Sequence, residues 1–481
     1  MNAAEGNKGP ELVRALGVWS ATAIVIGAMV GQGIFLYASQ MARDVGSATG
    51  VLAVWLMGGV IVFLGALCYA ELGAAMPAAG GDFVYLSRGL GPMWGFLYGW
   101  TRSFLMTPAS LATIAAGLLR FTGFLLPSVA TPICVWQISG LWSAQPYQFT
   151  LTTAQLLAAA VIAVMAIINY VGVRTAGRIQ VILTGLKVAA VIMIIALGLT
   201  LGTVGGIISA HLSARLTLGA GGLFLAALVP AMAGYNGFQY LGIVGGEIVN
   251  PQKNIPRAAM LGVLSVVALY LLINLAYFRV LTFSQVTQSQ HVASDAVALV
   301  AGQRGARWIT IAMIISALGA LHVGFLTGPR VPYAMAREGQ FFRFAGRIQP
   351  QFYTPSGALV FQGCMTTLLV LTGTFEELYS LSIFSVWLFF LLTAIALIRL
   401  RIKEPGLPRP YRAWGYPWTP LVFASAALAM TVNLWWARPG RSSAGLVIIL
   451  LGIPFFNYWR RRTAGLRMDN TPQLEEEKGG R

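Results

Sequence analysis

Long runs of apolar residues decide what this chain of 481 residues can form. A helix needs about 20 mostly apolar residues to cross the hydrocarbon core of a bilayer. Runs of this kind recur from one end of the sequence to the other, and they predict an all-α integral membrane protein. We expect twelve transmembrane helices, at residues 17–38, 48–76, 92–119, 152–171, 178–203, 221–247, 258–281, 306–331, 356–373, 378–400, 417–436 and 443–459.

The composition excludes a soluble protein. Charged residues make up 10% of the chain, whereas a soluble domain carries about 25%, and mean hydropathy is +0.73. The net charge of +17 does not indicate a nucleic-acid binder, because the basic residues are scattered among short loops and form no patch. We therefore expect a lipid bilayer around the chain and no nucleic acid.

The distribution of basic residues predicts the orientation. Twelve spans place both termini on one side of the membrane. With that side cytoplasmic, about two thirds of the Lys and Arg residues fall in inside segments, as the positive-inside rule requires. We expect residues 1–16 and 460–481 to be cytoplasmic, in the plasma (inner) membrane. Arg102 and Lys187 remain at membrane depth.

The sequence lacks motifs for disulfide, metal or ATP-dependent chemistry. Cys68, Cys134 and Cys364 are too dispersed for a disulfide framework or a zinc site. No GxxxxGK[ST] string indicates ATP-driven pumping. We expect no cofactor, no metal and no enzymatic activity. The first apolar segment runs beyond signal-peptide length and is interpreted as a retained span.

Glycine clusters mark two spans as interrupted helices. The first span carries Gly27, Gly31 and Gly33, and the sixth carries Gly234 and Gly237 among further glycines. Unwound backbone at membrane depth is tolerated where it lines a cavity, so such a pair of spans indicates a transporter site. Residues 28–31 and 231–234 also echo each other, through either an internal repeat or chance.

Seven motifs in a fixed order carry a family resemblance over nearly the whole chain. They lie at residues 26–35, 69–86, 169–174, 247–256, 334–339, 354–356 and 409–412. The chain resembles the amino acid-polyamine-organocation transporters, and within them the L-type amino acid transporter branch. Gln32 is a departure, because the family usually has serine there.

The resemblance implies the leucine-transporter fold. Residues 17–203 and 221–400 would form two inverted repeats of five helices, with helices 1 and 6 broken and residues 417–459 supplying two extra helices. The substrate would be an amino acid held near the midplane. Its carboxylate would lie on the backbone of Gly31, Gln32 and Gly33. The acceptors for its ammonium would be the backbone of Met29, Ala233 and Asn236.

The same residues suit these groups physically. A half-helix that restarts after Gly31 directs free N–H groups and the positive end of its dipole at an anion. The remaining residues of the second break, Gly234, Tyr235 and Gly237, belong to the same candidate site. Ala233 stands where relatives usually have a large aromatic that closes over the substrate. Tyr235, Phe238 or Phe325 would replace that aromatic, or would simply pack in the core.

Lys187 lies about nine residues into the fifth span, roughly 13 Å along a helix. Its stem, about 6 Å long, is too short to reach the membrane surface, and amines at such depth are costly and usually functional. The family's similar lysine occupies the place where sodium-coupled relatives hold a cation. Lys187 is thus interpreted as a sodium surrogate for coupling, or as a structural amine bound to carbonyls.

Four other polar residues are candidates for lesser roles. Arg102 would be structural or would contact substrate or a gate. His322, a histidine within a span, would line the pocket or pack. Glu71 and Glu247, near cytoplasmic helix ends, would pair with loop cations as an inner gate or scaffold.

The leading functional interpretation is a secondary transporter of L-amino acids that works by alternating access, independent of sodium, as an exchanger or coupled to protons. The alternatives are a polyamine or organocation transporter, and an amino acid receptor without transport. The sequence leaves oligomeric state open, a homodimer included. Cys134 lies in the outer loop through which animal relatives bind a covalent accessory subunit, but its flanks do not support such a partner.

Overall fold

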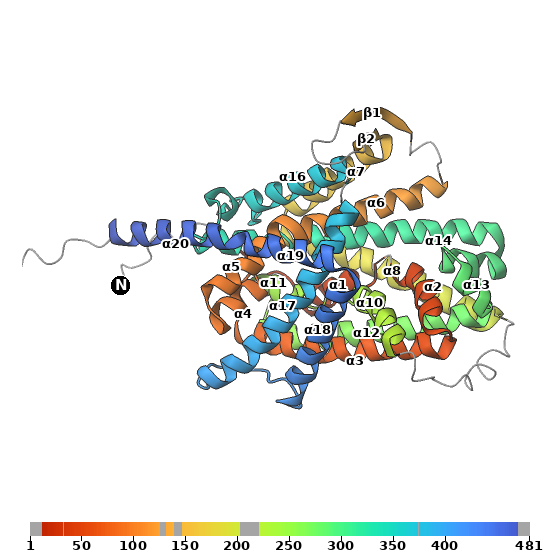
Figure 1. Ribbon diagram of the computed structural model, residues 1–481, viewed down its shortest axis with the longest axis horizontal. Coiled ribbons are helices and arrows are strands. Elements are labelled where there is room, and N and C mark those ends of the chain that lie inside the picture. The colour runs from red at the N-terminus through yellow and green to blue at the C-terminus, as the bar shows by residue number, and fades with distance from the viewer. Residues whose placement is uncertain are drawn as a thin grey trace, which may run out of the picture.

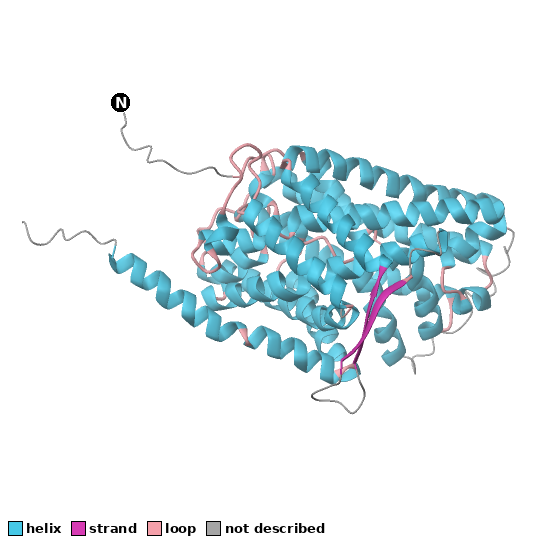
Figure 2. Cartoon of the chain, turned by 90° about the horizontal axis from the view of Figure 1, so that it is seen from above, coloured by secondary structure: helices cyan, strands magenta, loops and turns pink. Residues whose placement is uncertain are grey.

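The computed structural model describes residues 12–31, 33–125, 131–138, 147–202, 221–373 and 375–469, and these are almost entirely helical (Figure 2). Gln32, most of the N-terminal segment 1–16 and residues 470–481 lie outside the described residues.

The first part of the chain forms eight helices, a π turn and two strands. They are α1 (Val18–Met29), α2 (Gly33–Val45), α3 (Ala48–Ala75), α4 (Asp82–Gly89), α5 (Pro92–Thr101), the π turn η1 (Arg102–Met106), α6 (Thr107–Leu125), β1 (Pro132–Ile138), β2 (Tyr147–Thr152), α7 (Thr153–Tyr170) and α8 (Val173–Leu201). Caps set some of the starts. The Ser47 hydroxyl accepts the Gly50 N–H at 3.0 Å before α3, and Thr152 with Gln155 forms a capping box before α7.

The second part is helical throughout its described length. It comprises α10 (Gly221–Gly234), α11 (Tyr240–Ile243), η4 (Gly245–Glu247), α12 (Pro251–Val280), α13 (Phe283–Gln288), α14 (Val292–Thr327), α15 (Arg330–Arg337), η5 (Arg343–Gly346), α16 (Ser356–Thr372), α17 (Phe375–Lys403), α18 (Trp418–Ala437), α19 (Pro439–Leu450) and α20 (Gly452–Asp469). The long helices α3, α12 and α14 lie along a common direction (Figure 1).

Nine segments of the described chain are helices long and apolar enough to cross a membrane, or ten if the bent pair α1 and α2 is one span. Helix α16, with 17 residues, and α10, with 14, are shorter than those nine. All twelve predicted segments contain helix. The integral membrane class is therefore supported, and the count of twelve stays a prediction.

Some helix ends differ from those predicted. Helix α12 begins at Pro251 rather than at 258, because a proline at the first helical position leaves no N–H unsatisfied. Helix α14 begins at Val292, well before 306, and Gly302 interrupts it with a φ of 67°. Helix α20 continues to Asp469, into the segment predicted as the C-terminal tail.

A two-stranded antiparallel sheet departs from the all-α prediction. β1 and β2 pair between α6 and α7 at the edge of the helices (Figure 1), with Cys134 opposite Leu151. The Cys134 thiol is free and half-buried. Alternation along two short strands does not stand out in so apolar a sequence.

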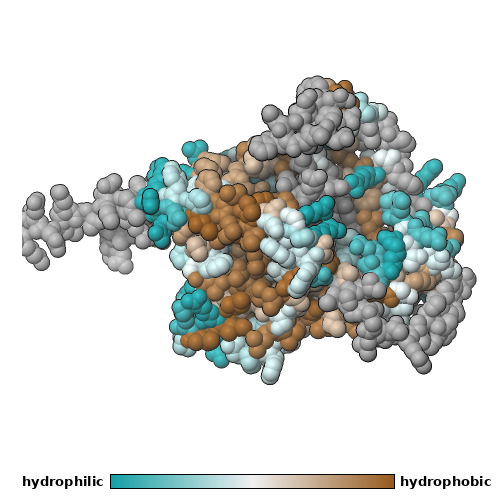
Figure 3. All heavy atoms as spheres, viewed as in Figure 1, coloured by the Kyte–Doolittle hydropathy of each residue, from teal (hydrophilic) through white to brown (hydrophobic). Residues whose placement is uncertain are grey.

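Apolar side chains also cover the outside of the bundle. Ile182, Leu264 and Val360 each expose more than half of their surface, and Figure 3 shows a broad apolar area on one face with hydrophilic residues toward both ends. An apolar surface of this extent indicates contact with lipid. The polar groups that could bind a solute must therefore lie inside, where α1 contacts α8, α12 and α14.

Candidate substrate-binding site

The first span is broken in its middle. Helix α1 ends at Met29, α2 begins at Gly33, and the axes of the two helices differ by 42°. The last carbonyls of α1 have no N–H donors further along their own helix. In a membrane interior, donors for these carbonyls must come from other groups. The carbonyl of Ile26 receives the N–H of Val30 at 2.8 Å.

Lys187 supplies partners for the next carbonyls. Its Nζ donates to the Gly27 oxygen at 2.8 Å and to the Val30 oxygen at 3.0 Å, and the side chain is 1% exposed. A Cβ on Gly319 would come within 2.6 Å of the Lys187 Cε, so α14 approaches the lysine stem through a glycine. The amine thus bridges α8 to the end of α1. Both interpretations of Lys187 fit this geometry, and its role stays a prediction.

Two more side chains of α8 continue this contact along α1. Thr184 donates to the Ala23 oxygen at 3.0 Å, and Gln180 donates to the same oxygen at 3.4 Å. Positions 180, 184 and 187 fall on one helix face. A Cβ on Gly27 would lie 2.0 Å from Nε2 of Gln180, so glycine there permits the close approach.

The sixth span is broken beside the first. Helix α10 ends at Gly234, and the backbone turns through residues 235–239 before α11. Gly237 has a φ of +140°, and a Cβ there would lie 2.5 Å from the Cβ of Ala28. The two breaks therefore touch at a position that requires glycine.

Tyr270 of α12 joins the two breaks. Its hydroxyl lies 2.6 Å from the Met29 oxygen and 2.9 Å from the Gly234 oxygen. Since a hydroxyl carries one proton, the two carbonyls share a single donor. Nothing in the sequence distinguished Tyr270 from other tyrosines within spans.

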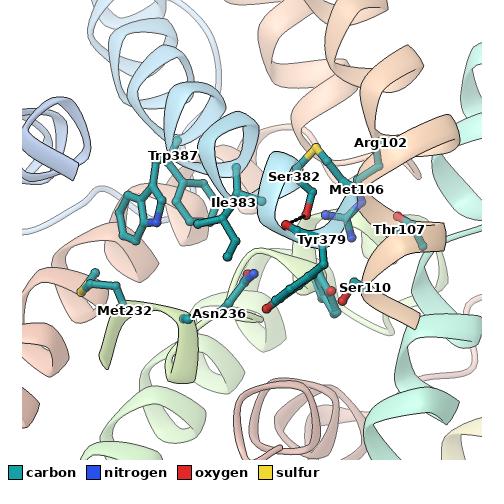
Figure 4. A pocket seen from close by; sticks show the side chains of 14 residues that line it. Arg102, Met106, Thr107, Ser110, Met232, Asn236, Tyr379, Ser382, Ile383 and Trp387 are labelled. Atoms are coloured by element: carbon teal, nitrogen blue, oxygen red, sulfur yellow. Dashed lines mark hydrogen bonds between the residues drawn. The ribbon is translucent and has the colours of Figure 1, made fainter. Parts of the chain in front are cut away.

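Two adjoining cavities lie at the breaks. The first, here the helix-break cavity, has a volume of about 130 Å³ and lies between α1, α2, α6, α14 and α17. The second, here the Arg102 cavity, extends from it between η1, α6, α10 and α17 (Figure 4). Both cavities share part of their lining, namely Ser110, Ala233, Asn236, Tyr240 and Tyr379.

Half of the predicted binding residues line these cavities. They are Met29, Gly31, Gly33, Ala233 and Asn236. Gly234, Tyr235 and Gly237 belong to the second break but not to the lining, and Gln32 lies outside the described residues. The Tyr235 hydroxyl donates to the Trp55 oxygen at 2.9 Å, which directs its ring into the core.

His322, Phe238 and Phe325 also lie away from the lining. His322 is fully buried, with Nδ1 2.9 Å from Oε1 of Gln180. Phe238 contacts the ring of Phe390, and Phe325 packs in an apolar cluster with Leu111.

Three tyrosines supply aromatic lining that sequence reasoning missed. Tyr37, Tyr240 and Tyr379 line the helix-break cavity. Tyr37 is one helical turn beyond Gly33, and that spacing was a usable signal, because residues four apart share a helix face. The structure thus offers different aromatics from the three predicted to compensate for Ala233.

Ion pairs fix the ends of two helices. Glu247 accepts from Arg330 at 2.9–3.1 Å, with both side chains 1% exposed or less. Glu71 accepts from Arg401 at 2.8 Å and from the Ala413 N–H at 2.7 Å, and Arg409 lies 3.5 Å away. Both carboxylates pair with cations, but Arg330 and Arg401 belong to α15 and α17 and not to the predicted loops. A gating role stays a prediction.

The start of the described chain is attached to the same region. The backbone N–H groups of Ala15 and Leu16 both donate to the backbone carbonyl oxygen of Glu247 at 2.9 Å. The Val249 N–H in turn donates to the backbone oxygen of Leu16 at 2.9 Å. The segment before α1 is therefore held against the end of the broken sixth span.

Comparisons with known proteins find similar sequences over most of the chain. Residues 16–456 match the amino acid permease family. The chain is 27% identical to a serine/threonine exchanger of Bacillus subtilis, over 94% of this chain and 98% of the relative. It is 30% identical to the mouse Asc-type amino acid transporter 1 (94% and 82%) and 31% identical to the rat large neutral amino acids transporter small subunit 2 (96% and 84%).

The buried pair of Glu247 and Arg330 generates a stability prediction. Arg330→Met leaves the Glu247 carboxylate buried without its cation, and we expect the free energy of unfolding to fall by about 3 kcal/mol. The double variant Glu247→Gln with Arg330→Met should recover part of that loss. The measurement is unfolding by SDS titration in mixed micelles.

The matched control is Arg88→Met, which removes a pair with Glu404 whose side chains are 45% and 35% exposed. An exposed pair contributes about 0–1 kcal/mol, so this control should change little. Equal losses in the single and double variants would contradict the assignment of the loss to the unpaired carboxylate.

Proposed function

The chain belongs to the amino acid permease family, and we propose that it moves L-amino acids across the plasma membrane as a secondary transporter that works by alternating access. The observation that carries the proposal is the contact of two broken helices beside a cavity. Gly237 of the second break lies against Ala28 of the first, and the lining includes residues of both breaks. Unwound backbone around a cavity is the arrangement in which transporters hold solutes at membrane depth.

The lining suits both charged groups of an amino acid. The carboxylate would lie at the start of α2, where Gly31 and Gly33 line the cavity and the first N–H groups of a helix attract an anion. The ammonium would lie on the backbone of Met29, Ala233 and Asn236. The Met29 carbonyl already accepts from Tyr270 at 2.6 Å and from the Gly31 N–H at 2.8 Å, so an ammonium bound there would replace one of these two donors.

The proposal includes the arrangement of two repeats, residues 17–203 and 221–400, followed by residues 417–459. The presence of one break near the start of each repeat supports it. Both termini would lie on the cytoplasmic side. Opening of the site toward that side would separate the helix ends that the ion pairs of Glu71 and Glu247 hold together. The buried Glu247–Arg330 contact is consistent with this scaffold.

Sodium independence is proposed from Lys187. Its ammonium lies between the Gly27 and Val30 carbonyls, where a second cation would be repelled. Coupling would then be exchange or proton symport. A polyamine is a weaker candidate, because Arg102 lines the second cavity and would repel a cationic chain.

The test is uptake into proteoliposomes of purified full-length protein. A panel of unlabelled L-amino acids is supplied inside and outside, with and without a pH gradient. Accumulation or exchange of at least one amino acid supports the proposal. Binding without any flux would instead identify a receptor, and exchange with only polyamines would identify the organocation alternative.

The cation site predicts the effect of sodium. Replacing sodium by choline should leave the rate of amino acid exchange unchanged, because Lys187 occupies the carbonyls that a sodium ion would need. The measurement is the initial exchange rate in matched sodium and choline buffers. A several-fold lower rate in choline would mean that the role of Lys187 is misassigned.

The carboxylate site predicts the effect of bulk at Gly33. Gly33→Val should abolish amino acid binding while the protein still elutes as a folded species, because a Cβ there comes 2.4 Å from Tyr37 and crowds the cavity. The measurement is equilibrium binding of radiolabelled amino acid. Gly185→Val is the control, since Gly185 has no atom within 4 Å of an added Cβ. Wild-type affinity in folded Gly33→Val would remove this site.

The bridge that Lys187 forms between α8 and the end of α1 predicts different effects on turnover and on substrate affinity. Lys187→Ala should lower exchange turnover by at least about tenfold, since two charge-assisted hydrogen bonds are lost. The substrate dissociation constant should change far less, because Lys187 does not line the cavities. The control is Leu186→Ala, whose side chain is 48% exposed. Equal losses of affinity and turnover would place Lys187 in substrate binding.

A further inference from the structure

Arg102 occupies an unusual position in its helix. It begins the π turn η1, and the Thr107 N–H donates to its carbonyl five residues back. Short π turns inside α-helices are frequent at functional sites. The side chain is 5% exposed and lines the Arg102 cavity, into which it extends near Thr107 and Tyr379 (Figure 4).

No ion pair found among the described residues joins the guanidinium to a carboxylate. Among the ion pairs of the described residues, within 4.0 Å, none includes Arg102, and its Nε is buried without a hydrogen-bond partner there. The guanidinium carbon lies 4.9 Å from the centroid of the Tyr240 ring. A buried cation is costly unless an anion and hydrogen-bond acceptors compensate it.

Asp82 is a buried acidic group that forms none of the ion pairs found within 4.0 Å among the described residues. An electrostatic interaction with Arg102 is present, but Oδ1 of Asp82 accepts from Tyr69 and Thr393. Asp82 does not line either cavity. The carboxylate therefore moderates the charge of Arg102 without pairing with it, and Arg102, which also interacts with the Tyr240 side chain, lines the cavity.

The place of Arg102 relative to the substrate follows from the shared lining. An amino acid held at Gly31 and Gly33 lies in the helix-break cavity, and residues such as Ser110 and Asn236 line both cavities. The side chain of the substrate would enter the Arg102 cavity across this common wall. Arg102 and Thr107 are among the donors of its lining, whereas the Ser382 hydroxyl already donates to the backbone oxygen of Tyr379.

We propose that Arg102 binds the side-chain carboxylate of an L-amino acid, so that the preferred substrates are dicarboxylic amino acids. The proposal rests on the proposed function and names the substrate class of that site. A guanidinium matches a carboxylate with two parallel hydrogen bonds, whereas an amide offers one acceptor oxygen and a cationic side chain is repelled. The order of preference is acid, then amide, with basic amino acids excluded.

The experiment measures substrate choice in proteoliposomes of the full-length protein. Vesicles loaded with labelled L-alanine receive external L-glutamate, L-aspartate, L-glutamine, L-asparagine or L-lysine. We expect the acids to exceed their amides in exchange efficiency by about tenfold, as for one charge-assisted hydrogen bond. Arg102→Met should abolish this ratio, Arg102→Lys should retain part of it, and Arg257→Met, at an exposed arginine, should leave it unchanged.

The outcomes separate the inference from the proposed function. Exchange of amides or neutral amino acids without preference for acids overturns the inference and leaves the proposed function intact. Failure to exchange any amino acid overturns the proposed function itself. If Arg102→Met does not fold, thermal stabilisation of the wild-type protein decides, because at equal concentration the ligand that binds more tightly stabilises the folded state more. Greater stabilisation by L-glutamate than by L-glutamine supports the inference, and the reverse contradicts it.

Discussion

Backbone carbonyls that lose their helical partners inside a membrane are the constraint on which this structure depends. Each such group costs several kcal/mol if nothing replaces the missing N–H. At the end of α1, Lys187 binds the carbonyls of Gly27 and Val30, and Tyr270 binds that of Met29. Because these side chains come from α8 and α12, breaking one span also fixes where two others lie. Tyr270 reaches Gly234 as well, so both breaks share one support.

The parts of the site that a single sequence predicted are those where a residue type is costly in a membrane. Glycines at 31, 33 and 237 weaken a helix, so the breaks could be predicted from their clustering. An amine as deep as Lys187 needs acceptors, and carbonyls at a broken helix are the nearest ones. A buried carboxylate such as Glu247 needs a cation, and Arg330 provides it. The resemblance to a family added the order of these parts along the chain.

The parts that could not be predicted are made of residue types that are ordinary in membrane helices. Tyrosines are common in spans, and the sequence does not tell which face of its helix Tyr270 or Tyr379 occupies. The same holds for Phe325, because an apolar ring suits the core, where it lies, as well as it would suit the wall of a cavity. The kink at Gly302 was hidden for a related reason, since one glycine inside a helical pattern often leaves the helix straight.

The π turn at Arg102 also has a geometric consequence. A π turn accommodates an extra residue, and each residue of an α-helix turns the chain by about 100°. The faces of α5 and α6 are therefore out of phase, although the two helices form one span. Helix α5 packs against α19 and α20, whereas α6 packs against α14 and α16. A single span thus presents matching faces to two sets of neighbouring helices. Deleting one residue from the turn would rotate α5 relative to α6, so that only one of the two sets of contacts could be kept.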